Sequence, residues 1–330
     1  MSETAVLIIS ILAATLPVLV YISLIYWVDR YEKEPGWLLT ATFLWGAVPS
    51  VIIAYVANSV LGMPFYLLTS AATADTLVAS FIAPIVEESI KGAAVLGIFL
   101  FWKDEIDSPL DGIIYGAMVG LGFALVENVI YYVAQYQAGG LEAWGWNVFF
   151  RGLVFGLNHA LYTGMTGLGI ATALMSTNPL VKIGAPIAGW ATAVLLHTIH
   201  NLTVSFGNLI CLIGVFSDWG GIFLTLVIML WALLQERSWL KRYLAGEVAF
   251  GTLTLSQFEI ACSGRKRIRQ RWHALARGGY PAYRHTLHYH NLLSELAYKK
   301  HHFDLFKHEA TWKRVELLRE QIRLETHQVL

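Results

Sequence analysis

The stretch Ala83–Gly92, with the sequence APIVEESIKG, places two adjacent carboxylates and a lysine inside an apolar run. That run extends over about residues 76–102, which is long enough to cross a lipid bilayer. Ionisable side chains at such a depth cost about 2.5–3.5 kcal/mol each on insertion scales. We therefore expect Glu87, Glu88 and Lys91 to face pairing partners, water or a metal ion in a polar cavity.

The composition of the whole chain indicates a membrane protein. Of the 330 residues, 56% are hydrophobic and only 14% are charged, and the mean hydropathy is +0.55. Apolar runs of bilayer length fall at roughly 5–28, 37–61, 76–102, 110–134, 146–175, 184–214 and 219–235. The sequence therefore predicts an all-α, polytopic membrane helix bundle of about seven transmembrane helices, in which the two longest runs can tilt or break. Turn residues predict connectors at Pro35-Gly36, Ala138–Gly140, Ser176–Pro179 and Asp218–Gly221.

A zero net charge conceals two different parts of the chain. Residues 1–236 hold 6 Lys and Arg against 15 Asp and Glu, whereas residues 237–330 hold 17 against 8. We expect a transmembrane domain over 1–236 and a basic, mainly helical cytosolic region over 237–330. The N-terminal run lacks a preceding basic segment and is expected to be a retained first span. Two cysteines allow no disulfide framework and leave the redox compartment open.

Basic residues in the predicted loops indicate the orientation. Arg30, Lys33, Lys103 and Lys182 occupy alternate loops, and the intervening loops have no Lys or Arg. Positive loops favour the cytoplasm. The sequence predicts a multi-pass protein of the cell membrane with its N-terminus outside and its C-terminus in the cytoplasm.

The basic cluster Ser263–Arg271 lies beyond the last predicted span and is expected just inside the membrane. It can contact anionic lipid headgroups, or it can be the solvated surface of a small cytosolic domain. Nucleic-acid binding is a weaker explanation, because a membrane tether already accounts for the charge.

Only a few histidines and carboxylates fall deep inside the predicted spans: His159, His197, His200, Glu87, Glu88 and Glu127. At a rise of about 1.5 Å per residue, four of these helices place an ionisable residue roughly 12–22 Å from a helix end. The sequence thus predicts one slab of polar groups near the middle of the membrane.

Each of these residues also has a structural explanation. Lys91 can pair with Glu87 or Glu88 on the same helix face and merely lock that helix. Glu127 can be a protonated packing residue, and His200 is expected to pack or to support another ligand. Arg151 can carry its charge into the same cavity or extend to the outer interface, and the second is the expectation.

Taken together, the polar groups support hydrolytic chemistry. A catalytic zinc ion (Zn²⁺) needs three N or O ligands, an open position and a nearby carboxylate. Glu127, His159 and His197 can supply the ligands, with Glu87 or Glu88 as the base. Without metal, a glutamate can activate water while His197 and Asn201, spaced i, i+4, stabilise an oxyanion.

Four motifs, in this order, resemble the PrsW-like intramembrane proteases, which are related to the CAAX prenyl proteases and bacteriocin-processing proteins. They are Glu87-Glu88-x-x-Lys91, Phe123-x-x-x-Glu127-Asn128, the segment Arg151 to His159, and His197-x-x-x-Asn201. The stretch Asp29–Pro35 also resembles that branch. In the wider group the first motif usually ends in Arg and the second in His, so Lys91 and Glu127 fit the PrsW-like branch.

The resemblance implies an intramembrane endopeptidase that cuts a membrane-anchored protein, in some members an anti-sigma factor. By position, Glu87 and Glu88 would activate water. The same correspondence implies that Glu127, His159, His197 and Asn201 bind metal or stabilise the transition state.

Two other functions use the same residues. A proton- or cation-coupled transporter can relay protons through a buried Glu and His set, although no inverted repeat is visible. A non-catalytic scaffold can use the polar cluster for helix association and the basic tail for partners.

Overall fold

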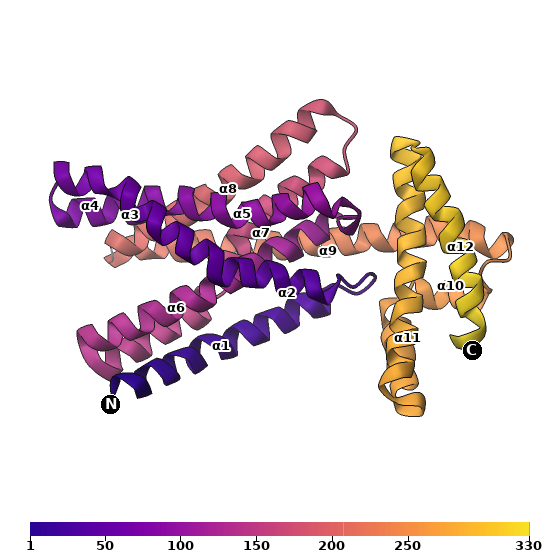
Figure 1. Cartoon of the computed structure of the whole chain (residues 1–330), viewed down its shortest axis with the longest axis horizontal. Helices are drawn as coiled ribbons and strands as arrows, with labels where there is room; N and C mark the ends of the chain where they lie inside the picture. Colours follow the sequence, from indigo (N-terminus) through magenta and orange to yellow (C-terminus); the bar gives the residue numbers. More distant parts are fainter. Residues whose placement is uncertain (207, 330) are drawn as a thin grey trace. The chain divides into compact units, whose positions relative to one another are not determined.

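All the regular secondary structure is helical over the residues that the structure describes, 1–206 and 208–329 (Figure 1). This computed structural model has no β-strand among those residues. The elements up to residue 105 are α1 (Glu3–Val28), α2 (Gly36–Trp45), η1 (Gly46–Ser50), α3 (Val51–Leu68), α4 (Ala71–Leu77), η2 (Val78–Ile82), α5 (Ala83–Phe101) and η3 (Lys103–Glu105). They are followed by α6 (Pro109–Asn147), η4 (Val148–Val154), α7 (Asn158–Leu174), α8 (Pro179–Phe206), η5 (Asn208–Ile210), α9 (Cys211–Ala249), α10 (Leu255–Ala261), α11 (Gly264–Phe306) and α12 (Glu309–Val329).

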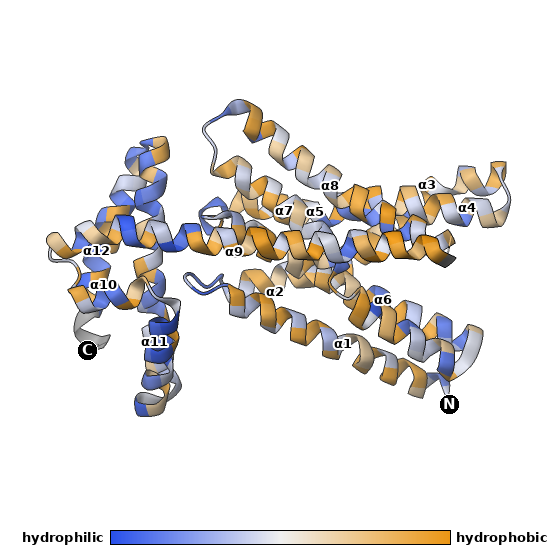
Figure 2. Ribbon diagram, turned by 180° about the vertical axis from the view of Figure 1, so that it is seen from behind, coloured by the Kyte–Doolittle hydropathy of each residue, from blue (hydrophilic) through white to orange (hydrophobic). Residues whose placement is uncertain are grey.

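Five helical stretches are long and apolar enough to cross a membrane: Glu3–Val28, Gly36–Leu68, Pro109–Leu174, Pro179–Phe206 and Cys211–Ala249. The stretch Pro109–Leu174 contains two of the predicted apolar runs, and α5 has 19 residues but carries three ionisable side chains. Figure 2 shows apolar residues along α1 and α9 and polar residues along α11. These features confirm the predicted all-α membrane bundle.

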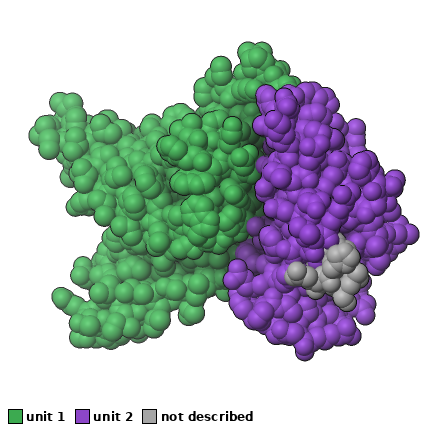
Figure 3. Space-filling model, turned by 45° about the vertical axis from the view of Figure 1, so that its right-hand side comes forward, with its two compact units in different colours: residues 1–25, 34–229 green, residues 26–33, 230–330 purple. Residues whose placement is uncertain are grey.

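The chain divides into two compact units (Figure 3). Unit 1 contains residues 1–25 and 34–229, and unit 2 contains residues 26–33 and 230–330. Unit 2 has its own core, in which Leu240 and Leu244 of α9 pack with Leu296 of α11 and Leu318 of α12.

Helix α6 forms the centre of unit 1. Ser108 and Asp111 make a capping box at its N-terminus, and Pro109 occupies the first turn, where a missing N–H costs nothing. Every residue from 110 to 124 is buried, as expected for a helix that is apolar on all sides. Its glycines at 112, 116 and 120 lie against the backbone of α7, so the two helices approach closely.

Two predicted connectors coincide with breaks in the helices. Gly139 and Gly140 have non-helical backbone angles inside α6, and the φ of 69° at Gly140 is one that glycine adopts far more readily than other residues. Residues 176–178 connect α7 to α8. The long run 146–175 is also interrupted, because residues 155–157 separate η4 from α7 and leave His159 in the first turn of α7.

The connector predicted at Asp218–Gly221 is wrong, because these residues lie within the continuous helix α9. The predicted span 184–214 is also wrong at its C-terminal end, since α8 ends at Phe206 and α9 begins at Cys211. Helix α9 continues through Gly220 and Gly221 because each glycine costs a helix only about 1 kcal/mol. Asp218 offsets part of this cost by accepting hydrogen bonds from side chains of two neighbouring helices.

Candidate active site

The two adjacent glutamates of α5 have different environments. Glu88 is 0% exposed and accepts three hydrogen bonds: from Lys91 Nζ at 2.5 Å, from Thr163 Oγ1 at 3.0 Å and from His197 Nδ1 at 3.0 Å. Such a carboxylate is fully engaged and is suited to holding its neighbours in place.

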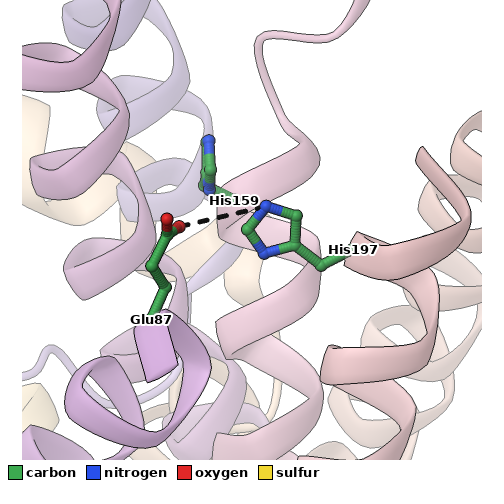
Figure 4. A group of neighbouring side chains, drawn as sticks. All are labelled: Glu87, His159 and His197. Carbon is green, nitrogen blue, oxygen red and sulfur yellow. Dashed lines mark ion pairs between the residues drawn. The ribbon is translucent and has the colours of Figure 1, made fainter. Parts of the chain in front are cut away.

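Glu87 instead keeps one oxygen available. Its Oε1 lies 3.5 Å from Asn58 Nδ2, whereas its buried Oε2 has no hydrogen-bond partner among the described residues. The Oε2 atom lies 3.9 Å from both His197 Nε2 and Lys91 Nζ. Figure 4 shows that Glu87 and His197 come from different helices and point toward each other, with His159 beside them.

One carboxylate, Glu127, binds His159. The Nε2 atom of His159 lies 2.9 Å from Glu127 Oε2, and the same oxygen accepts a hydrogen bond of 2.5 Å from Arg151 Nη2. Arg151 Nε also donates to Asn128 Oδ1 at 3.0 Å. The expectation that Arg151 extends to the interface is therefore wrong, because its partners lie on α6.

The arrangement around the two histidines is symmetrical. Glu88 binds His197 through Nδ1, and Glu127 binds His159 through Nε2. Each imidazole thus has one nitrogen fixed by a carboxylate, while the other nitrogen of His197 lies 3.9 Å from Glu87 Oε2 and the other nitrogen of His159 lies 3.4 Å from Lys91 Nζ. Donor atoms of Glu87, His159 and His197 all lie within 4.8 Å of one another.

This donor set fits a divalent metal ion. Two imidazoles and a carboxylate are a common catalytic zinc ligand set, and carboxylates behind the imidazoles orient them. The partnerless Oε2 of Glu87 is the kind of buried atom that a cation would satisfy. The side-chain nitrogen of Lys91 lies 3.4 Å from His159 Nδ1, so a lysine side chain already lies beside these donor atoms.

The structure groups different residues from the predicted metal ligands Glu127, His159 and His197. The carboxylate that has an oxygen within 4.8 Å of a nitrogen of each histidine is that of Glu87, whereas Glu127 pairs with Arg151 and with Nε2 of His159. Sequence spacing does not report the rotation of α5 relative to α6, on which this choice depends.

A cavity of about 260 Å³ adjoins these side chains. Four of the predicted site residues line it: Glu127, His159, His197 and Asn201. Arg151, Asn158 and His200 add further polar side chains to the lining. Asn201 donates one N–H of its amide to the Ala79 carbonyl of η2 at 2.8 Å. His159 and His197 both line this cavity, whereas Glu87 and Glu88 are not among its lining residues.

One buried acid of this region was missed by the sequence analysis. Asp218 is 0% exposed and accepts hydrogen bonds from Tyr162 Oη at 2.9 Å and from His200 Nδ1 at 2.7 Å. Its neighbours Trp219, Gly220 and Gly221 resemble a turn, although the surrounding apolar residues continue on both sides.

Comparison with known proteins identifies the family. The family model described as "PrsW family intramembrane metalloprotease" matches residues 34–251, which include every candidate site residue. No solved structure matches the chain.

Several curated relatives are named Protease PrsW. The chain is 32% identical to the one from Geobacillus kaustophilus over 160 residues, which is 47% of this chain and 62% of that protein. It is 29% identical to the one from Oceanobacillus iheyensis over 195 residues (58% and 81%) and 30% identical to the one from Bacillus subtilis over 172 residues (50% and 69%). The chain thus spans less than two thirds of the Geobacillus relative. These matches confirm the resemblance drawn from the motifs and argue against a transporter: the chain belongs to the PrsW family of intramembrane proteases.

Proposed function

We propose that this chain hydrolyses a peptide bond of a membrane-anchored protein inside the bilayer, and that Glu87 activates the water. The observation that carries this proposal is the convergence of Glu87, His159 and His197 on one point beside a cavity in an apolar bundle. A water between these atoms has a carboxylate oxygen to take its proton and two imidazoles to hold it.

The other polar groups have supporting roles in this proposal. Glu88 holds His197 and Lys91, and Glu127 with Arg151 holds His159. The amide of Asn201 keeps a second N–H after its bond to Ala79, and that N–H can stabilise the developing oxyanion.

A metal ion, most simply zinc, would be held by Glu87, His159 and His197, and Glu87 would then be a ligand of the ion instead of the base that takes the proton of the water. When bound, the ion would acidify the attacking water and polarise the scissile carbonyl. Glu88 and Glu127 would then keep the two imidazoles oriented for it, and loss of such an outer carboxylate typically weakens metal affinity 10–100-fold.

Metal analysis tests this ligand set. We expect about one ion per purified wild-type chain, and loss of that ion in Glu87→Gln, His159→Ala and His197→Ala. The Glu127→Gln variant should retain the ion with weaker affinity. Full loss in Glu127→Gln with retention in Glu87→Gln would restore Glu127 as the ligand.

Proteolysis is tested by co-expression with a panel of single-span membrane proteins that carry an epitope tag at each end. We expect at least one panel member to be cut by the wild-type chain and to stay intact with Glu87→Gln. The matched control is Glu142→Gln, which changes an exposed glutamate of α6 and should leave cleavage unchanged. Equal cleavage by Glu87→Gln and wild type would reject the mechanism.

The substrate we propose is a protein anchored by one span, and an anti-sigma factor is the candidate that the resemblance implies. Cleavage in the membrane requires the substrate helix to unwind, because a helical peptide bond is shielded by its own hydrogen bonds. Anti-sigma factors of the host belong in the panel for this reason.

We propose that the chain lies in the cell membrane with its N-terminus outside and its C-terminus in the cytoplasm. The support is the alternation of basic and non-basic loops. A cysteine placed at Glu142 should react with a membrane-impermeant thiol reagent added outside intact cells, whereas one placed at Lys182 should not.

We also propose that one face of α11 contacts anionic lipid headgroups. Arg265, Arg269 and Trp272 are exposed at positions that share a helix face, and Trp272 is 62% exposed. No Asp or Glu occurs from residue 260 to 294. Arginine beside an exposed tryptophan is typical of helices at an anionic membrane surface.

An environment-sensitive dye tests this contact. With Cys211 and Cys262 replaced by serine, a dye on Trp272→Cys should shift to the blue in nanodiscs with phosphatidylglycerol but not in phosphatidylcholine alone. Arg265→Glu with Arg269→Glu should remove the shift. A dye on exposed His288 serves as the control.

A further inference from the structure

Asp218 joins three helices of unit 1 but has no part in the mechanism above. It lies on α9, and both of its oxygens are engaged: Oδ1 by Tyr162 of α7 and Oδ2 by His200 of α8. Because a fully buried carboxylate is costly, the bonds that it makes must repay a considerable desolvation penalty.

The contact with Asp218 fixes the tautomer of His200. Nδ1 of His200 lies 2.7 Å from Asp218 Oδ2 and 3.2 Å from Asn158 Nδ2. An ionised carboxylate can only accept a hydrogen bond, so with Asp218 ionised the proton lies on Nδ1, and Asn158 Nδ2, which is also a donor, does not bond to that nitrogen. The neutral imidazole then carries a lone pair on Nε2. No hydrogen bond engages Nε2 among the described residues, and His200 lines the cavity.

Asp218 is also linked to His197 of the candidate site through an aromatic ring. Tyr162, which donates to Asp218 Oδ1, stacks on the His197 ring with centroids 4.9 Å apart and planes 20° apart. Asp218 therefore holds two side chains that line the cavity, one on each adjacent helix.

We infer that His200 contacts the substrate and that Asp218 is its positioning residue. This inference rests on the proposed proteolysis. An unwound substrate helix has backbone N–H groups without partners, and each is costly in an apolar environment. His200 Nε2 accepts a hydrogen bond from one such N–H next to the scissile bond, and Asp218 keeps Nε2 in the accepting form.

The inference predicts a defect in binding more than in chemistry. His200→Phe keeps a ring but loses the acceptor, and we expect the KM for the cleaved panel protein to rise about tenfold while kcat changes less than threefold. Asp218→Asn can donate to Nδ1, which moves the imidazole proton to Nε2, and should raise KM by a similar factor. His200→Gln, whose amide oxygen can accept, should recover part of the affinity.

A double-mutant cycle separates positioning from mere structural support. Because Asp218 acts through His200, the double variant should raise KM no more than about twofold beyond His200→Phe alone. The control on the same helix is Thr225→Val, since this buried hydroxyl donates to the Gly221 carbonyl of its own helix and has no other hydrogen-bond partner among the described residues. Measurements use the full chain reconstituted in vesicles, with the melting temperature of each variant.

The outcomes are distinct. Unchanged KM in His200→Phe, or fully additive effects in the cycle, would overturn the inference while Glu87→Gln remained inactive. If Asp218→Asn lowers the melting temperature strongly, His200→Phe and His200→Gln alone decide. Absence of cleavage by the wild-type chain would instead reject the proposed function.

Discussion

Glu88 and Lys91 are a fully buried ion pair whose members are both 0% exposed. Attraction between such charges roughly offsets their desolvation, but removing one member leaves the other buried without compensation, at a cost of about 3–5 kcal/mol. Lys91 also lies 3.9 Å from Glu87, so its charge affects both carboxylates of α5. The pair is better understood as a device that fixes these groups than as a source of stability.

This pair predicts a specific pattern of stabilities. Glu88→Gln and Lys91→Met should each lower the free energy of unfolding by about 3–5 kcal/mol, because each leaves an unpaired buried charge. The double variant Glu88→Gln/Lys91→Met should recover more than half of that loss. Unfolding followed by tryptophan fluorescence in detergent measures the three values, and a double variant as unstable as the sum of the singles would contradict the prediction.

At this scale the sequence could identify the candidates but not their partners. Glu87, Glu127, His159 and His197 were found because ionisable residues inside apolar runs must be compensated. Which carboxylate joins the two histidines depends on the rotation of each helix about its axis, which spacing within one helix does not report. Asp218 was missed because the Trp-Gly-Gly that follows it resembles a turn, whereas its compensation comes from α7 and α8.

The packing of α6 against α7 determines where His159 lies. A Cβ atom on Gly120 would collide with the backbone carbonyl of His159, and one on Gly112 would collide with that of Gly167. The small residues of α6 thus set the separation of two helices that each carry a residue of the candidate site.

Gly120→Ala should therefore displace His159 and impair cleavage. We expect the free energy of unfolding to fall by about 1–3 kcal/mol, as for overpacked cores, together with loss of most of the activity. The matched control is Gly145→Ala on the same helix, where a Cβ meets nothing within 4 Å and alanine favours the helix by about 1 kcal/mol. Equal effects of the two substitutions, in unfolding and cleavage assays, would show that the close approach is unimportant.

The elements were predictable where length and hydrophobicity decide them. The N-terminal run and the glycine break at Gly139–Gly140 follow from composition and turn chemistry. The interruption at residues 155–157 and the continuity of α9 through Asp218 were not predictable, because both depend on tertiary contacts that offset local preference.

Across the whole molecule, charge and histidine content follow the division into two parts. Eight of the eleven histidines and most of the basic residues lie beyond residue 236. The family match ends at residue 251, so α10, α11 and α12 lie beyond it. The interior of unit 2 contains buried cationic groups: Arg267 is 0% exposed and donates to the Tyr31 and His290 backbone carbonyls, and burial lowers its pKa to about 10.

His290 makes the stability of unit 2 sensitive to pH. It is 0% exposed, its Nδ1 accepts from Arg271 Nε at 3.1 Å, and its Nε2 donates to Gln270 Oε1 at 2.8 Å. Burial, together with the charges of Arg267 and Arg271, lowers the pKa of His290 well below the usual 6.5. Both ring nitrogens are engaged in the neutral form, so protonation requires this arrangement to break.

The sign of the effect follows from proton binding. Below a pH of about 6.5 the unfolded chain binds a proton at His290 and the folded chain does not. The contribution of His290 to the stability of unit 2 is therefore complete above that pH and is lost as the pH decreases. The free energy of unfolding falls by up to about 1.4 kcal/mol per pH unit for this group. Burial also lowers the pKa of His301 to about 4, and that residue adds to the same slope.

Hydrogen exchange of α11 in the full chain, with exposure times corrected for the intrinsic rate, should therefore show less protection at pH 5.5 than at pH 7.5. His290→Gln should lose about half of the pH dependence, whereas His288→Gln, which changes an exposed neighbour, should keep all of it. Equal pH dependence in wild type and His290→Gln would mean that other groups control the acid sensitivity of this unit.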